Sequence, residues 1–282
     1  MTRPILLIAA SPPGGIGVGQ LFMRSLLLHA PAQFVIAALL GRQEPTYQVP
    51  SDLGIAATVT LQRRFEPAFR PWSNRLSHLA AAMAVRARLE PQVRRLLDPL
   101  TQFAQRQGAT ALFVVLECPT TMLLAAPLAD RLGLPLLTLV WDTPEHILGQ
   151  LGHLGPSRAH IKRGFDRALV RSHGVAVMSE AMRDRYASEY GARCVILHQP
   201  IEPDWLPPHI QDERAGGDLV IGFAGSDTAR PEMLMLLSAL DRMQWQLQGR
   251  QVILRVFGLR FVCEGRVPRR IDYRGYLPEI AD

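Results

Sequence analysis

Polar residues follow several apolar runs of this 282-residue sequence, at the points where strands are expected to end. Glu117 comes directly after the run 111–116, and Asp142 and His146 follow the run 134–140. Carboxylates and imidazoles can orient a hydroxyl group or move a proton in general acid–base catalysis. Ligands of open α/β sheets bind outside the carboxyl ends of the strands, so these three side chains are candidate catalytic residues.

Each of the three residues also has a purely structural interpretation. Asp142 would cap the turn that follows it, and His146 would lie on a partly buried helix. Glu117 would place a negative charge at a helix N-terminus, where it favours the helix dipole. The residue types fit both interpretations.

A glycine-rich loop, Ser-Pro-Pro-Gly-Gly-Ile-Gly-Val-Gly, covers residues 11–19 between an apolar run and a helical pattern. Gly15 and Gly17 would let backbone amides approach an anion at the helix N-terminus, although a tight turn explains these glycines as well. The loop has neither the dinucleotide-binding spacing nor the Gly-Lys-Ser/Thr of a Walker A motif. These absences count against NAD and ATP enzymes.

A second glycine-containing turn lies at 222–230. Gly225 and Ser226 follow a predicted strand, and Arg230 opens the next helical pattern. Glycine and a cation at a helix start suit a diphosphate, and a tight turn is again the alternative. No motif in the sequence has plausible metal-ligand spacing, so we expect no metal and no other cofactor.

Short apolar runs alternate with helical patterns along the first part of the chain. The expected strands cover residues 4–10, 34–40, 111–116, 134–140, 174–178 and 195–197. The expected helices cover 18–29, 119–132 and 179–190, with 75–107 broken into two or three pieces by Pro91 and Pro99. Nearly continuous apolar strands that alternate with helices are typical of a doubly wound α/β domain with a parallel sheet.

Proline-rich residues 200–217 predict a linker between an N-terminal domain, 1–199, and a second domain, 218–282. The second domain has its own α/β pattern, with strands at 219–224, 252–257 and 273–276 and a helix at 231–248. A doubly wound domain of this size would leave strand edges and a sheet face uncovered. We therefore expect an α/β protein in which the second domain is incomplete.

The composition is that of a folded protein, because 48% of the residues are hydrophobic and 20% are charged. Three distant cysteines and the lack of a long apolar run favour a cytoplasmic protein. Residues 62–106 hold nine arginines and three acidic residues of a chain with net charge +6. This stretch would contact an anionic membrane at its inner face, or else form a solvated helical face. It has no readable helix-turn-helix or stacking motif, so we expect no nucleic-acid partner.

Several segments resemble GT-B glycosyltransferases, and among them the retaining family 4. The likeness rests on the Gly-Gly-x-Gly loop at 14–17 and on Val-Met-Ser-Glu-Ala-Met-Arg-Asp-Arg-Tyr at 177–186. It extends to Glu-Tyr-Gly-Ala-Arg-Cys-Val-Ile-Leu-His-Gln-Pro-Ile-Glu at 189–202 and to Ile-Gly-Phe-Ala-Gly-Ser at 221–226. The order of these segments along nearly the whole chain matches the family.

The resemblance implies two Rossmann-like domains that face a cleft. The first domain would bind a glycan or lipid-linked acceptor near Asp142, and the second would bind a nucleotide-sugar donor. The sugar would be transferred with retention and without a metal ion. The positions that would lie near the donor phosphates are Gly15, Gly17, Gly225, Ser226 and Arg230.

The sequence also departs from the family pattern. Ser226 stands where the family usually has arginine, and the chain ends before the Glu-x7-Glu region that grips the donor. We therefore expect a truncated donor half and little or no activity from this chain alone. The alternatives are a non-enzymatic glycan- or membrane-binding module and a GT-B-like epimerase.

Overall fold

The structure is a computed structural model that divides the chain into two compact units, Met1–Trp205 and Leu206–Asp282. It describes residues 3–14, 18–30, 33–41, 47–63, 75–153, 155–198, 217–225, 230–258 and 271–275. Each unit contains parallel strands and at least one helix that packs on them. The predicted α/β class is confirmed.

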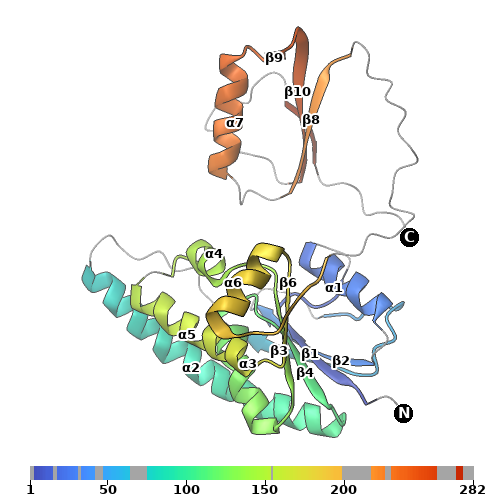
Figure 1. The fold of residues 1–282 in the computed structure, drawn as a ribbon, viewed down its shortest axis with the longest axis vertical. Coiled ribbons are helices and arrows are strands. Elements are labelled where there is room, and N and C mark those ends of the chain that lie inside the picture. Colours follow the sequence, from blue (N-terminus) through green and yellow to red (C-terminus); the bar gives the residue numbers. More distant parts are fainter. Residues whose placement is uncertain are drawn as a thin grey trace. The chain divides into compact units, whose positions relative to one another are not determined.

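The first unit is built on a seven-stranded parallel sheet with the order β3-β2-β1-β4-β5-β6-β7 (Figure 1). Its strands are β1 (Ile5–Ala9), β2 (Phe34–Gly41), β3 (Thr58–Arg63), β4 (Ala111–Val115), β5 (Leu136–Val140), β6 (Gly174–Val177) and β7 (Cys194–Ile196). Nearly every residue of β1 and β2 is buried. Strands covered on both faces have this uniform burial, which is why their sequences read as continuous apolar runs.

Strand β3 was not among the expected strands. It lies at one edge of the sheet, and its residues alternate between exposed and half-buried positions. An edge strand needs apolar side chains on one face only, so Thr58, Thr60 and Gln62 occupy the exposed positions. Because of this alternation the segment contains no continuous apolar run, which is the pattern from which the other strands are predicted.

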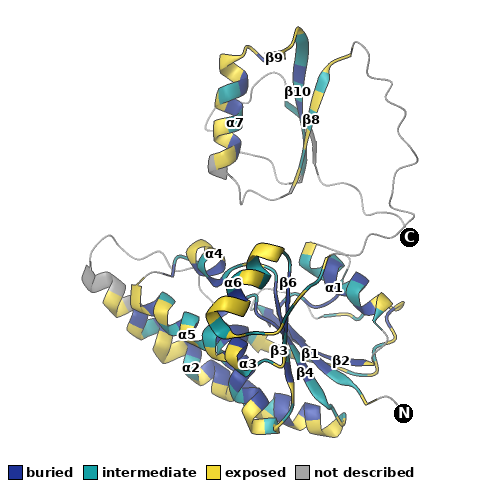
Figure 2. Ribbon diagram, viewed as in Figure 1, coloured by how far each residue is buried: buried dark blue, intermediate teal, exposed yellow. Residues whose placement is uncertain are grey.

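Six helices of the described residues flank the sheet. They are α1 (Val18–His29), α2 (Arg75–Arg106), α3 (Pro119–Leu132), α4 (Pro144–Gln150), α5 (Gly155–Arg171) and α6 (Glu180–Tyr190). Helix α1 covers one face with Phe22, Met23 and Leu27, whereas α2, α3 and α5 pack on the other face (Figures 1 and 2). The sheet is therefore sandwiched between two helical layers.

The expectation of separate helical pieces at 75–107 is wrong, because α2 runs unbroken through Pro91 and Pro99. Each proline lacks the N–H that would bond the carbonyl four residues earlier, on Ala87 and Arg95. Both of those residues are exposed, so water can satisfy their carbonyls. Burial of the opposite face against the sheet holds the helix together; the buried residues include Val85, Leu89, Val93, Leu96, Leu100 and Phe103.

The termini of α3 and α6 agree with the sequence prediction. Helix α3 begins at Pro119 and ends at Gly133, whose φ of 64° is left-handed. In α6 the Ser179 hydroxyl accepts a hydrogen bond from the Met182 backbone amide at 3.2 Å, and Gly191 ends the helix with φ 62°. A proline at the first helical position, a serine N-cap and a glycine after the last turn each affect only the adjacent turn of the helix. Such local signals can be recognised in the sequence.

Lys162 ties α5 to α6. Its ammonium group donates to Asp166 Oδ1 at 2.8 Å and to the Tyr190 hydroxyl at 3.2 Å. The Tyr190 hydroxyl in turn donates to Asp166 Oδ1 at 2.7 Å. Burial lowers the pKa of Lys162, but these two hydrogen bonds outweigh it and leave the pKa above its ordinary value.

The described residues of the second unit form three parallel strands, β8 (Leu219–Gly225), β10 (Arg250–Gly258) and β11 (Ile271–Gly275), in the order β11-β10-β8. A short strand, β9 (Gln246–Leu247), pairs antiparallel with β10. Helix α7 (Arg230–Arg242) buries Met233, Leu237 and Leu240 against one face of this sheet. On β8 the alternate residues Val220, Gly222 and Ala224 are exposed.

Helix α7 is shorter than the expected 231–248. Gln244 and Trp245 have left-handed φ values of 52° and 56°, which end the helix and lead into β9. The Trp245 indole N–H donates to Asp241 Oδ1 at 2.7 Å and fixes this turn. The sequence contains no glycine or proline at the point where the helix ends. The predicted helix therefore ends several residues too late.

We predict that Gly164→Ala destabilises the first unit by about 1–3 kcal/mol, because a Cβ on α5 would overlap α3. An ideal Cβ on Gly164 would lie 2.7 Å from Leu123 Cδ2 and 3.0 Å from the Met122 carbonyl oxygen. Urea denaturation followed by circular dichroism measures the change. The matched control is Gly149→Ala in α4, where nothing lies within 4 Å, and it should raise stability by up to about 1 kcal/mol. Equal effects of the two substitutions would contradict the packing argument.

Candidate functional site

The carboxyl ends of β1, β4 and β5 lie next to one another at the middle of the sheet. Glu117 follows β4, whereas Asp142 and His146 follow β5. Because neighbouring parallel strands end at the same edge, the structure brings these three residues to one edge of the first unit. The loop that begins at Ser11 leaves β1 at the same edge.

Glu117 connects the ends of β1 and β4. Its Oε1 accepts hydrogen bonds from the backbone amides of Ala10 at 2.6 Å and Ser11 at 2.9 Å. Burial raises the pKa of the Glu117 carboxyl, and the bonds from Ser11 and Ala10 and the charge of Arg63 oppose that rise. The carboxylate therefore fixes the start of the glycine-rich loop.

The glycine-rich loop folds back on the start of α1. The Gly14 amide donates to the Gln20 carbonyl oxygen at 3.2 Å. An ideal Cβ on Gly19 would lie 3.1 Å from Trp141 Cη2, so a larger residue here would require the indole to shift slightly. The Trp141 ring also meets Phe22 edge-on, with centroids 6.0 Å apart. Gly15 and Gly17 lie outside the described residues.

The loop after β5 leaves the carboxylate of Asp142 exposed. Thr143, rather than Asp142, caps α4, because its hydroxyl accepts a hydrogen bond from the His146 amide at 3.3 Å. Within the described part of the chain Asp142 has no hydrogen bond or ion pair. The His146 side chain is exposed as well, with Nε2 2.9 Å from Gln150 Nε2. Both groups are accessible to a ligand at this edge.

An ion pair joins the two helices that follow β5 and β6, and sequence reasoning missed it. Arg185 Nη2 on α6 donates to Glu145 Oε1 on α4 at 3.1 Å, while Arg185 Nε donates to Glu189 at 3.0 Å. These bonds raise the pKa of Arg185. Glu145 Oε2 is buried and has no hydrogen-bond partner among the described residues. No local pattern signals a pair whose members lie forty residues apart.

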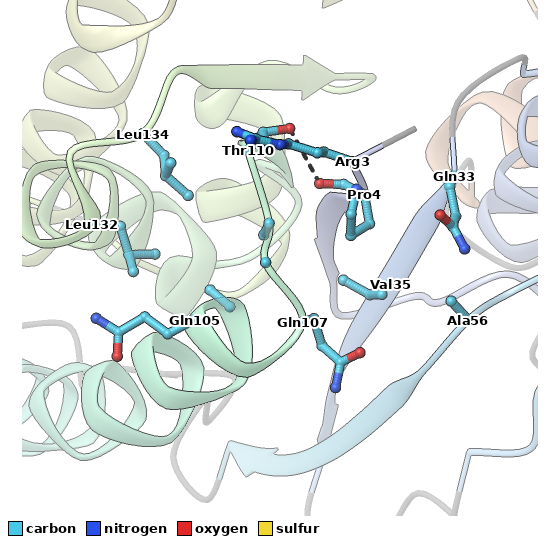
Figure 3. A pocket seen from close by; sticks show the side chains of 13 residues that line it. Arg3, Pro4, Gln33, Val35, Ala56, Gln105, Gln107, Thr110, Leu132 and Leu134 are labelled. Carbon is cyan, nitrogen blue, oxygen red and sulfur yellow. Dashed lines mark hydrogen bonds between the residues drawn. The ribbon is translucent and has the colours of Figure 1, made fainter. Parts of the chain in front are cut away.

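A depression of about 1160 Å³ lies at the opposite edge of the sheet (Figure 3). Residues that precede strands line it, among them Arg3 before β1, Gln33 before β2 and Thr110 before β4. The Thr110 amide donates to the Pro4 carbonyl oxygen at 3.0 Å and closes one side. None of the predicted site residues that the structure describes lines this depression, and its described side chains carry no carboxylate or imidazole for proton transfer.

In the second unit, two predicted donor-binding residues flank the connection between β8 and α7. Gly225 is the last residue of β8 and pairs with Gly258 of β10, whereas Arg230 is the first residue of α7. Ser226 lies outside the described residues. The connection thus joins the carboxyl end of a parallel strand to a helix N-terminus, where backbone N–H groups favour anions.

The described residues contain neither a cluster suited to a metal ion nor a helix suited to a membrane. No group of three or more His, Cys, Asp and Glu side chains is arranged to hold a metal ion. None of the helices has both the length and the apolar character that crossing a membrane requires.

Comparison with known proteins gives matches at the level of structure. No protein-family model and no curated protein matches this sequence. Sucrose-phosphate synthase from Thermosynechococcus elongatus superposes with a TM-score of 0.63 at 12% identity, over 98% of this chain and 71% of that one. HepE from Anabaena, solved with UDP, gives 0.56 at 13% identity, over 99% and 70%. The chain has the GT-B glycosyltransferase fold.

A plant enzyme shares this GT-B fold. UGT2 of Phytolacca americana, solved with UDP-2fluoro-glucose and pterostilbene, gives a TM-score of 0.53 at 16% identity, over 99% of this chain and 72% of that one. The sequence-based prediction of the GT-B fold is confirmed. The assignment to the retaining family 4 stays a prediction.

We predict that Glu117→Gln flattens the pH dependence of stability. Because the pKa of Glu117 lies above the ordinary carboxyl value of 4.5, the folded protein keeps a proton that the unfolded chain releases. The stabilisation from this group is complete below pH 4.5 and is lost as the pH rises through the raised pKa. Urea denaturation of both proteins across this interval measures the effect. Parallel pH profiles for Glu117→Gln and the unsubstituted protein would contradict it.

Proposed function

We propose that this protein transfers a sugar from a nucleotide-sugar donor to a hydroxyl group of a glycan or lipid-linked acceptor, with retention at the anomeric carbon. The observation that supports it is the GT-B fold, shared over 99% of the chain with one structure solved with UDP-2fluoro-glucose and one solved with UDP. In this proposal the first unit binds the acceptor and the second binds the donor.

The acceptor would bind at the carboxyl edge of the first sheet. Asp142 presents an exposed carboxylate there, and it would accept a hydrogen bond from the reacting hydroxyl. His146, in the first turn of α4, would contact the same substrate. Glu117 would act on the loop after β1, since its carboxylate holds the amides of Ala10 and Ser11.

The donor diphosphate would bind where β8 leads into α7. The bond between the anomeric carbon and the diphosphate oxygen breaks during transfer, and negative charge develops on the leaving phosphate. The Arg230 guanidinium and the N-terminus of α7 would stabilise that charge, with Gly225 allowing close approach. Ser226 would hydrogen-bond a phosphate oxygen, and the amides of Gly15 and Gly17 would face the same group. This role for arginine makes the proposed reaction independent of a metal ion.

Calorimetric titration with UDP and UDP-glucose, followed by an assay of nucleoside diphosphate release over a panel of sugar nucleotides, tests the proposal. We expect saturable donor binding and slow transfer, because Ser226 replaces the arginine that the family resemblance leads us to expect. Binding without transfer to any acceptor would favour a non-enzymatic glycan-binding module. No binding of any nucleotide or nucleotide-sugar would refute the proposed function.

We predict that Asp142→Asn lowers the transfer rate about 100-fold or more, because the amide accepts no proton from the acceptor. Donor affinity should stay unchanged, since Asp142 lies on the acceptor side. The matched control is Asp130→Asn on α3, which removes an exposed carboxylate paired with Arg171 at 2.8 Å. That control should leave the rate unchanged. A normal rate in Asp142→Asn would exclude this residue from proton transfer.

We predict that Arg230→Gln weakens UDP binding about 10- to 100-fold, because a charge-assisted hydrogen bond to phosphate contributes about 1.5–3 kcal/mol. The control is Arg242→Gln at the other end of α7, which should bind UDP normally. Addition of EDTA should change neither affinity nor transfer. If EDTA abolishes transfer and Mg²⁺ restores it, the metal-independent mechanism is wrong.

A further inference from the structure

A pocket of about 290 Å³ opens between α2, α3 and α5, in the helical layer that covers the sheet on the side away from α1. The three helices lie side by side in Figure 1. Arg86 of α2 and His160, Arg163 and Arg167 of α5 supply its polar groups. Leu123 and Pro127 of α3 supply apolar lining. The pocket is distinct from the strand ends that carry the proposed transfer site.

Positive charge exceeds negative charge around this pocket. Glu90 is a carboxylate that contacts two of the lining residues: its Oε1 accepts from Arg86 Nε at 2.9 Å and lies 3.7 Å from His160 Nε2. Among the described residues, neither Arg163 nor Arg167 has an ion-pair partner. Three guanidinium groups thus face one carboxylate, which favours an anionic ligand.

His160 has an unsatisfied ring nitrogen at this position. Its Nε2 is buried without a hydrogen-bond partner among the described residues, and it lies 3.7 Å from Glu90 Oε1. Burial lowers the pKa of His160 and favours the neutral ring, although the charge of Glu90 opposes this. Buried polar atoms are nearly always hydrogen-bonded, so this nitrogen would gain a partner if a ligand displaced the groups that cover it.

The pocket has fixed walls. Gly164 lies on α5 between Arg163 and Arg167, where an ideal Cβ would overlap Leu123 of α3. The close packing of the two helices at Gly164 leaves little room for α5 to shift toward α3. A pocket between closely packed helices binds a ligand at a lower cost of rearrangement.

We propose that this pocket binds a phosphate group, carried by a soluble phosphorylated molecule or by an anionic lipid headgroup. The planar guanidinium fork matches two phosphate oxygens, and several arginines together form strong phosphate sites. A volume of about 290 Å³ is at the low end for ligand pockets and suits one phosphate group better than a whole nucleotide.

If the phosphate belongs to a lipid headgroup, the lipid would also contact two exposed apolar side chains of α2. Leu79 and Met83 are 54% and 63% exposed, and they precede Arg86 at helical spacing on the same side of α2. Apolar side chains beside arginines are typical of helices that lie in a membrane interface. A soluble phosphate would leave both side chains unchanged.

Titration of the full chain with inorganic phosphate, and co-sedimentation with phosphatidylcholine vesicles with and without phosphatidic acid, tests the proposal. Arg163→Gln/Arg167→Gln should weaken binding about tenfold or more, and His160→Gln should weaken it by a smaller factor. Response to inorganic phosphate supports a soluble ligand. Response only to phosphatidic acid vesicles supports a lipid headgroup.

The matched control is Arg94→Gln/Arg106→Gln, which removes two charges from exposed positions of α2 outside the pocket. It should change binding by less than about twofold. Arg230→Gln should also leave phosphate binding to this pocket intact. Loss of phosphate binding at the pocket can therefore be told apart from loss of donor binding at the proposed transfer site. Absence of binding by both probes, or equal losses in the two double variants, would overturn the proposal.

Discussion

The carboxylate of Glu117 joins the end of the central strand of the first sheet, β4, to the end of its neighbour β1, and the geometry of that edge depends on it. A carboxylate in this half-buried position needs hydrogen-bond donors, and the amides of Ala10 and Ser11 supply them. Those two bonds fix the direction in which the chain leaves β1. The start of α1 then reaches Trp141, which packs closely against Gly19. The exposed Asp142 follows that tryptophan directly.

The parallel sheet gives the first unit two kinds of surface, the edge formed by the strand ends and the outer surface of the covering helices. Parallel strands send all their carboxyl ends to one edge, so residues that follow different strands gather there without being close in sequence. Buried strands also require helices on both faces, and those helices form a second kind of surface. In this chain the strand ends carry exposed carboxylate and imidazole groups, whereas the α2, α3 and α5 layer carries arginines. The two kinds of chemistry thus occur on different elements of the same unit.

Sequence reasoning succeeded where the determining interactions are local or where burial is uniform. The apolar strands β1, β2, β4 and β5 and the caps at Ser179 and Gly133 belong to these classes. It failed where the tertiary context decides: packing against the sheet keeps α2 intact, and the edge position lets β3 carry polar residues. The candidate edge residues were readable from strand ends. The bond from Glu117 to the β1 loop and the pair between Glu145 and Arg185 were not, because they join distant segments.

The contact between Lys162, Asp166 and Tyr190 has a practical consequence, because Lys162 is the only lysine in the sequence. Reagents that acylate amines can modify this chain at one side chain and at the N-terminus. Its raised pKa and its two hydrogen bonds make that amine a poor nucleophile in the folded state. Acylation of this side chain is therefore slowed in the folded state and becomes faster when α5 and α6 separate, so that the rate of labelling responds to local opening of the protein without any engineered probe.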